Sequence, residues 1–121
     1  MKTNVRETNG ISIIEPVSRL MGPATSELRA TVLSCVNASS APSILFDLRR
    51  VRRVDSGGLG VLLSTYGVVI SKSGKTGVVN VGKIKNLHIQ GCLLNCFDHF
   101  ETENVAIQAF LREPVFASKV T

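Results

Sequence analysis

The sequence has no tryptophan, one tyrosine, two histidines and three cysteines among its 121 residues. Three cysteines are too few, and odd in number, for the disulfide framework of a small secreted domain. The longest apolar runs, such as residues 61–63 and 68–70, are far shorter than the roughly 20 residues that cross a membrane. The polar N-terminus also lacks the apolar core of a signal peptide. The sequence therefore predicts a cytoplasmic domain that does not enter a membrane.

Apolar residues make up 44% of the chain and charged residues 19%, which is typical of a globular fold. We expect a single domain over residues 1–121, with its core at about 4–112 and a C-terminal tail at 113–121. The net charge is +5, and four arginines fall within residues 49–53. This run is expected to be a solvated loop or a surface for an acidic partner. No aromatic ladder or recognition helix accompanies it, so we expect no direct contact with nucleic acid.

The pattern along the chain predicts strands that alternate with helices. Asn9-Gly10 between two strand-like stretches indicates a hairpin. Apolar spacing then predicts helices over 23–36, 56–72, 83–95 and 103–112, and strands over 2–8, 11–15, 44–48, 77–81 and 97–100. This order predicts an α/β fold with four helices and a mixed sheet of about five strands, in which the N-terminal hairpin is antiparallel and the remainder is mostly parallel.

The segment Asp55-Ser56-Gly57-Gly58-Leu59 is the candidate site, because it joins a buried strand to an amphipathic helix. Asp55 and Ser56 suit a helix cap, and the glycines leave the first turn bare enough for a partner or a phosphate to approach. A purely structural cap, with glycines that serve packing, explains the same local pattern.

Known catalytic motifs fail in this region. A dinucleotide fingerprint would need a glycine at Leu63, a nucleophile elbow one at Val54, and a phosphate loop one at Val69. His88, Cys92 and Cys96 recur at helical spacing, and His99 follows, so zinc is an alternative to ordinary core cysteines. We expect no catalytic residue, no cofactor and no metal.

Residues 54–63, which read Val-Asp-Ser-Gly-Gly-Leu-Gly-Val-Leu-Leu after the apolar strand 44–48, resemble the signature of the STAS domain. The closest subgroup is the bacterial anti-sigma factor antagonists, in which a hydrophobic strand leads into Asp-Ser-(Ser or small)-Gly-Leu-Gly at the start of a helix. The resemblance covers about residues 4–112 and implies a STAS-like fold that agrees with the predicted order of elements.

The resemblance implies a partner-switching signal protein in the control of transcription. In the family, the serine of this motif is phosphorylated by a partner that is both an anti-sigma factor and a serine kinase. The unmodified antagonist binds this kinase and frees a sigma factor, the modified form dissociates, and a serine phosphatase restores it. Carried over, Ser56 is the phosphoacceptor, and Asp55, Gly57, Gly58 and Leu59 bind the partner.

Two positions depart from the family pattern. Residues 18–21 read Ser-Arg-Leu-Met, so Met21 stands where the family has an acid close to the phosphorylated serine. Gly57 stands where many members have serine or threonine. We place Met21 with the expected partner-binding residues. A STAS domain that works without phosphorylation, as a scaffold in a signalling complex or as an accessory subunit of a transporter, is the alternative function.

Overall fold

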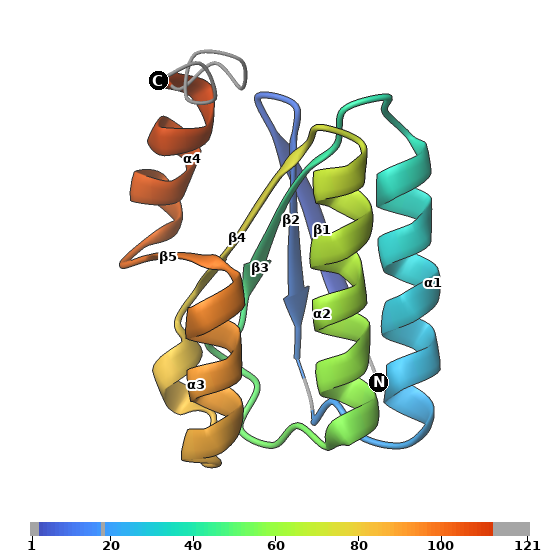
Figure 1. Ribbon diagram of the computed structural model, residues 1–121, viewed down its shortest axis with the longest axis vertical. Helices are drawn as coiled ribbons and strands as arrows, with labels where there is room; N and C mark the ends of the chain where they lie inside the picture. Colours follow the sequence, from blue (N-terminus) through green and yellow to red (C-terminus); the bar gives the residue numbers. More distant parts are fainter. Residues whose placement is uncertain (1–2, 18, 113–121) are drawn as a thin grey trace.

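A five-stranded mixed sheet lies at the centre of the computed structural model, which describes residues 3–17 and 19–112 (Figure 1). The strands lie in the order β1-β2-β3-β4-β5; β1 and β2 pair antiparallel, and every other pair is parallel. Their bounds are β1 Thr3–Thr8, β2 Ile11–Pro16, β3 Ser43–Asp47, β4 Lys75–Val79 and β5 Asp98–Phe100. The predicted α/β class and the mixed topology are confirmed.

The hairpin between β1 and β2 follows from its two turn residues. Asn9 and Gly10 have φ values of 53° and 81°, both in the left-handed region. A two-residue turn with two positive φ angles matches the twist of the strands that it joins, and Asn-Gly adopts it at low cost. The turn sets the register in which Thr8 pairs with Ile11.

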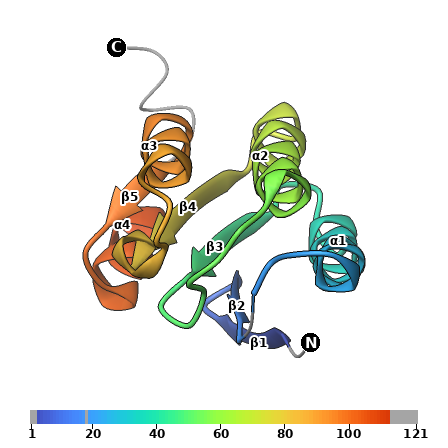
Figure 2. The same cartoon turned by 90° about the horizontal axis from the view of Figure 1, so that it is seen from below.

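Within the described residues, four α-helices cover the two faces of the sheet unequally. They are α1 Pro23–Asn37, α2 Ser56–Ser71, α3 Leu87–Cys96 and α4 Glu103–Arg112, and a short 3₁₀ helix, η1, spans Val81–Lys83. Figure 2 shows α1, α2 and α3 on one face and α4 on the other. The links at the carboxyl ends of β2, β3 and β4 lead into α1, α2 and η1, whereas β5 leads into α4.

Side-chain alternation along β3 fills both core layers. Ile44 and Phe46 point into the larger cluster beneath α1, α2 and α3, whereas Leu45 points into the smaller cluster beneath α4. All three side chains are fully buried. A nearly continuous apolar run is the expected pattern for a strand that is covered on both faces.

Two predicted elements are displaced in the structure. The fourth strand begins at Lys75 rather than at residue 77, because Lys75 donates its backbone N–H to the carbonyl of Pro42 at 2.9 Å and continues the pairing with β3. The third helix begins at Leu87 rather than at residue 83. The Asn86 side chain caps it there, and Ile84, whose spacing suggested an earlier start, is buried in the preceding connection instead.

Candidate functional site

Ser56 is the first residue of α2, directly after the loop that leaves β3. Asp55 precedes it in an extended conformation, and its Oδ1 accepts a hydrogen bond from the backbone N–H of Gly58 at 2.8 Å. This is the N-cap that the sequence predicts, since the first backbone donors of a helix have no partner within the helix. Ser56 itself is exposed, and no group in residues 3–17 or 19–112 makes a hydrogen bond to its hydroxyl.

The link between β2 and α1 supports this turn from one side. Leu20 donates its N–H to the carbonyl of Arg53 at 2.9 Å and accepts from the N–H of Asp55 at 3.2 Å. The N–H of Gly22 also points at Asp55 Oδ2, at 3.4 Å. Met21 therefore lies beside the start of α2, with 40% of its surface exposed.

Gly58 holds these two segments at close range. A Cβ atom there would lie 2.3 Å from the backbone oxygen of Leu20, so only glycine fits. Gly58 is buried, and Leu59 is half-buried against the larger core. Gly57, by contrast, is exposed, and a Cβ there would be no closer than 3.4 Å to any atom outside its own helix backbone and its chain neighbours.

The candidate residues thus divide by accessibility. Met21, Ser56 and Gly57 offer surface to another molecule, and Asp55 is half-buried. Gly58 is buried against the β2–α1 link, and Leu59 is partly buried against the larger core. The N-terminus of α2 carries the partial positive charge of the helix dipole, which favours an anion at this point. The geometry can therefore accept a phosphate on the Ser56 hydroxyl without rearrangement of the core.

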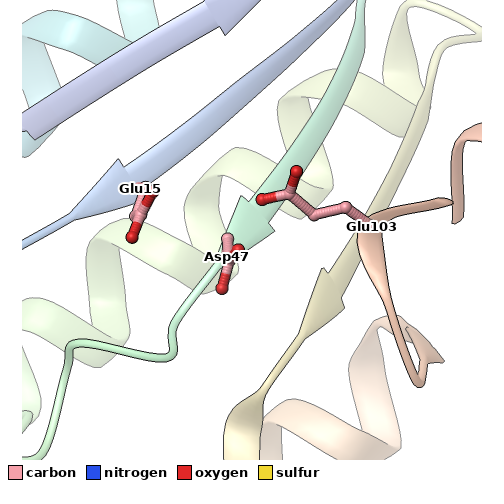
Figure 3. A group of neighbouring side chains, drawn as sticks. All are labelled: Glu15, Asp47 and Glu103. Carbon is pink, nitrogen blue, oxygen red and sulfur yellow. The ribbon is translucent and has the colours of Figure 1, made fainter.

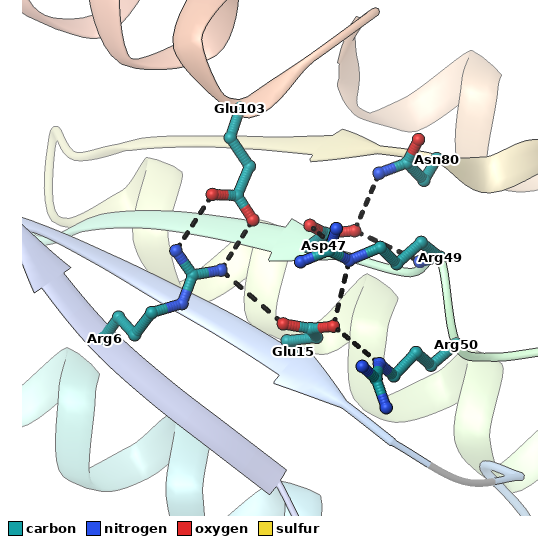
Figure 4. Close-up of polar contacts among 7 residues, drawn as sticks. All are labelled: Arg6, Glu15, Asp47, Arg49, Arg50, Asn80 and Glu103. Carbon is teal, nitrogen blue, oxygen red and sulfur yellow. Dashed lines mark hydrogen bonds and ion pairs between the residues drawn. The ribbon is translucent and has the colours of Figure 1, made fainter.

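A second cluster of charged side chains lies on the α4 face of the sheet, and the sequence pattern did not reveal it. One oxygen each from Glu15, Asp47 and Glu103 lies within 4.8 Å of the others, the only such group of three potential metal ligands in the part of the chain that the structure describes (Figure 3). We call these residues, with Arg6, Arg49, Arg50 and Asn80, the acid–arginine cluster (Figure 4).

Arginines neutralise the carboxylates of the acid–arginine cluster. Arg6 makes two contacts to the Glu103 carboxylate, at 3.0 and 2.6 Å. Arg49 Nε and Arg50 Nε lie 3.1 and 3.3 Å from Glu15 Oε2. Three arginines thus compensate three acids, and we assign no metal to this group. Arg49 and Arg50 are exposed in the loop after β3, as the solvated-loop interpretation expects, and their guanidinium groups also pair with Glu15.

The two acids nearest α4 have oppositely perturbed pKa values. Burial raises the pKa of Asp47, and a hydrogen bond with Glu103 raises it further, although the side chain of Asn80 and the backbone of Arg49 donate hydrogen bonds to it. The hydrogen bond from Arg6 lowers the pKa of Glu103 to about 2, and its contact with Asp47 acts in the same direction. Burial therefore disfavours the charged form of Asp47, whereas Arg6 favours the charged form of Glu103. The acid–arginine cluster ties β1, β2 and β3 to the start of α4.

The histidine and cysteine spacing does not assemble a metal site among the described residues. Cys92 Sγ lies 3.8 Å from His88 Nε2, but neither Cys96 nor His99 joins them in a group of three ligands. The core interpretation of the cysteines is also wrong in part, because Cys96 is exposed while Cys35 and Cys92 are half-buried.

Comparison with known proteins supplies the family context. The sequence model of the STAS domain matches residues 2–103. No curated protein sequence matches the chain. Among the helices of residues 3–17 and 19–112, none combines the length and the apolar character of a membrane span.

Several solved structures share the fold. A candidate anti-sigma factor antagonist from Thermotoga maritima is 19% identical, with 91% of this chain and 95% of that chain covered and a TM-score of 0.80. An anti-sigma factor antagonist from Mycobacterium paratuberculosis is 25% identical, with 93% and 94% covered and a TM-score of 0.77. The unphosphorylated anti-sigma factor antagonist SpoIIAA is 15% identical, with 93% and 100% covered and a TM-score of 0.73. The phosphorylated form of SpoIIAA, from Bacillus, is 18% identical, with 89% and 98% covered and a TM-score of 0.69.

Proposed function

Since the chain belongs to the STAS domain family, we propose that it is an anti-sigma factor antagonist whose binding is controlled by phosphorylation of Ser56. In its unphosphorylated form it binds an anti-sigma factor that is also a serine kinase, and a sigma factor is released. Phosphorylation of Ser56 ends this binding, and a serine phosphatase restores it. The chain acts as a binding module without a cofactor.

The exposure of Ser56 at the first position of α2 is the observation that carries this proposal. The hydroxyl has no partner among the described residues, so a kinase meets no internal hydrogen bond that it would have to break. The structural similarity to anti-sigma factor antagonists, one of which is known in unphosphorylated and phosphorylated forms, supports the same assignment.

The physical effect of the phosphate would fall on the interface rather than on the fold. A phosphoserine carries about −1.5 to −2 charges at neutral pH. At a helix N-terminus this charge is favourable, so the domain keeps its structure. The added volume and charge stand where Met21 and Gly57 also face outward, and a partner fitted to the bare hydroxyl can no longer approach.

The direct test is phosphate transfer to a single residue. The kinase is captured from a lysate of the source organism on the immobilised wild-type chain and then incubated with ATP and each variant. Mass spectrometry should find phosphate on the wild type and on Ser64→Ala, an exposed serine of the same helix that serves as the control, and none on Ser56→Ala.

A stable complex with no transfer to Ser56 would contradict the proposal. It would favour the alternative in which a STAS domain acts as an unphosphorylated scaffold or as an accessory subunit of a transporter. Transfer to a serine other than Ser56 would also contradict the assigned site.

A further inference from the structure

The end of the sheet at which Ser56 lies is strongly cationic. Three chain segments meet there, namely the described part of the β2–α1 link at 17 and 19–22, the β3–α2 loop with the first turn of α2 at 49–58, and the η1–α3 region at 80–90 (Figure 1). Together they hold half of the 14 lysines and arginines of the chain and one acid, Asp55. The seven basic residues are Arg19, Arg49, Arg50, Arg52, Arg53, Lys83 and Lys85.

Five of these seven basic residues are available to another molecule. Arg49 and Arg50 pair with Glu15 in the acid–arginine cluster. The other five are exposed, and within residues 3–17 and 19–112 none of them forms an ion pair. We call these five the cationic surface: Arg19, Arg52, Arg53, Lys83 and Lys85.

Backbone hydrogen bonds hold the cationic surface together across the three segments. The carbonyl of Arg53 accepts from the N–H of Leu20, and the carbonyl of Arg52 accepts from the N–H of Lys85, both at 2.9 Å. The adjacent Arg52 and Arg53 are therefore flanked by Arg19 on one side and by Lys85 on the other. Like charges at this density repel one another, so the arrangement is costly unless an anion lies against it.

Two exposed apolar side chains lie in the same segments. Leu87, which begins α3, is 77% exposed, more than any other large apolar residue that the structure describes, and Met21 is 40% exposed. Arginine and methionine are enriched at protein interfaces, where apolar anchors are surrounded by charged groups. Single-stranded nucleic acid is recognised instead mainly by stacking on several aromatic side chains, and the three segments contain no Phe, Tyr or Trp and a single histidine, His88.

We propose that the cationic surface, with Met21 and Leu87, binds an acidic segment of a partner protein that carries apolar residues between its acids. For its biological role this inference rests on the proposed function, because the surface adjoins Ser56 and would bind the same partner. It adds the chemical character of that partner, which the site at Ser56 alone does not specify.

The test uses the full unphosphorylated chain and a fluorescent eight-residue peptide of glutamates with leucine at positions three and six. Fluorescence anisotropy at low salt should show saturable binding. Arg52→Gln/Arg53→Gln should weaken it by about five- to thirtyfold, the expected effect of two lost charge contacts. The control Lys72→Gln/Arg112→Gln, which removes two exposed cations outside the three segments, should leave it unchanged. Leu87→Ser should weaken binding of this peptide but not of an all-glutamate peptide.

Three results would overturn the proposal: no binding of the leucine-containing peptide, equal losses in the two double variants, or tighter binding of an eight-nucleotide thymidine strand than of the peptide. Thermal melting of each variant establishes that it is folded. The failure of this proposal is separable from failure of the proposed function, because Ser56 phosphorylation is read by mass spectrometry and does not require the peptide.

Discussion

Replacement of Gly58 by alanine would place a methyl group 2.3 Å from the backbone oxygen of Leu20 and 2.9 Å from its Cβ. These atoms belong to the link that holds the N-terminus of α2, and the same oxygen accepts a hydrogen bond from the N–H of Asp55 at 3.2 Å. Relief of the clash therefore requires movement of backbone rather than rotation of a side chain. Gly58 does not have a positive φ, so alanine there adds no backbone strain, and the effect of the substitution comes from the close contact alone.

Three contributions set the expected change in the free energy of unfolding of Gly58→Ala. Overpacking costs about 1–3 kcal/mol, and loss of the Leu20–Asp55 hydrogen bond costs about 1 kcal/mol. The higher helix propensity of alanine stabilises the variant by up to about 1 kcal/mol. The net loss is about 2 kcal/mol, and for a chain of this size it corresponds to a fall of roughly 8 °C in Tm.

Gly60→Ala is the matched control on the same helix. No atom lies within 4 Å of a Cβ built at Gly60, so alanine there meets open space. This variant should gain about 0.5–1 kcal/mol from propensity. Chemical denaturation of both variants measures the difference, which we expect to be about 3 kcal/mol. Equal stabilities for Gly58→Ala and Gly60→Ala would refute the close approach of α2 and the β2–α1 link.

The acid–arginine cluster gives two further predictions. Arg6 lowers the pKa of Glu103 in the folded chain to about 2 from 4.5, so the ion pair stabilises the fold above pH 4.5 and this stabilisation is lost as the pH falls toward 2. In Arg6→Gln, the denaturation midpoint should therefore fall less between pH 4.5 and pH 2 than it does in the wild type. A pH profile identical to that of the wild type would disprove the pairing. The pKa of Asp47 is raised instead, so its ionised form opposes folding at neutral pH. Asp47→Asn should therefore keep the Tm at pH 7 within about 4 °C of the wild type. A loss above about 3 kcal/mol in the free energy of unfolding would mean instead that the carboxylate is an essential ion-pair partner.

Local sequence signals predicted the elements of the fold well, because each depends on neighbouring residues. Asn9-Gly10 specifies its turn by backbone conformation, and Asp55 specifies the start of α2 by its capping oxygen. The start of β4 could not be predicted in this way. Gly74 and Lys75 suggest a turn, but pairing with β3 extends the strand to include Lys75.

The acid–arginine cluster could not be predicted because its partners are distant in sequence. Arg6 and Glu103 are separated by 97 positions, and Arg49 and Glu15 by 34. Their contacts depend on the register of the sheet and on the face that α4 covers. A signal was nevertheless present, since Glu15 and Asp47 are acids near the ends of mainly apolar strands, where a buried charge requires a partner.

The most direct test of the proposed switch compares Ser56→Asp with the wild type in two measurements, thermal melting and binding to the captured anti-sigma factor kinase. We expect a Tm within about 2 °C of the wild type, because an exposed helix N-terminus accepts a negative charge. We also expect Kd to rise several hundredfold, which corresponds to about 3–4 kcal/mol. Unfolding of Ser56→Asp, or binding equal to that of the wild type, would contradict the proposed switch.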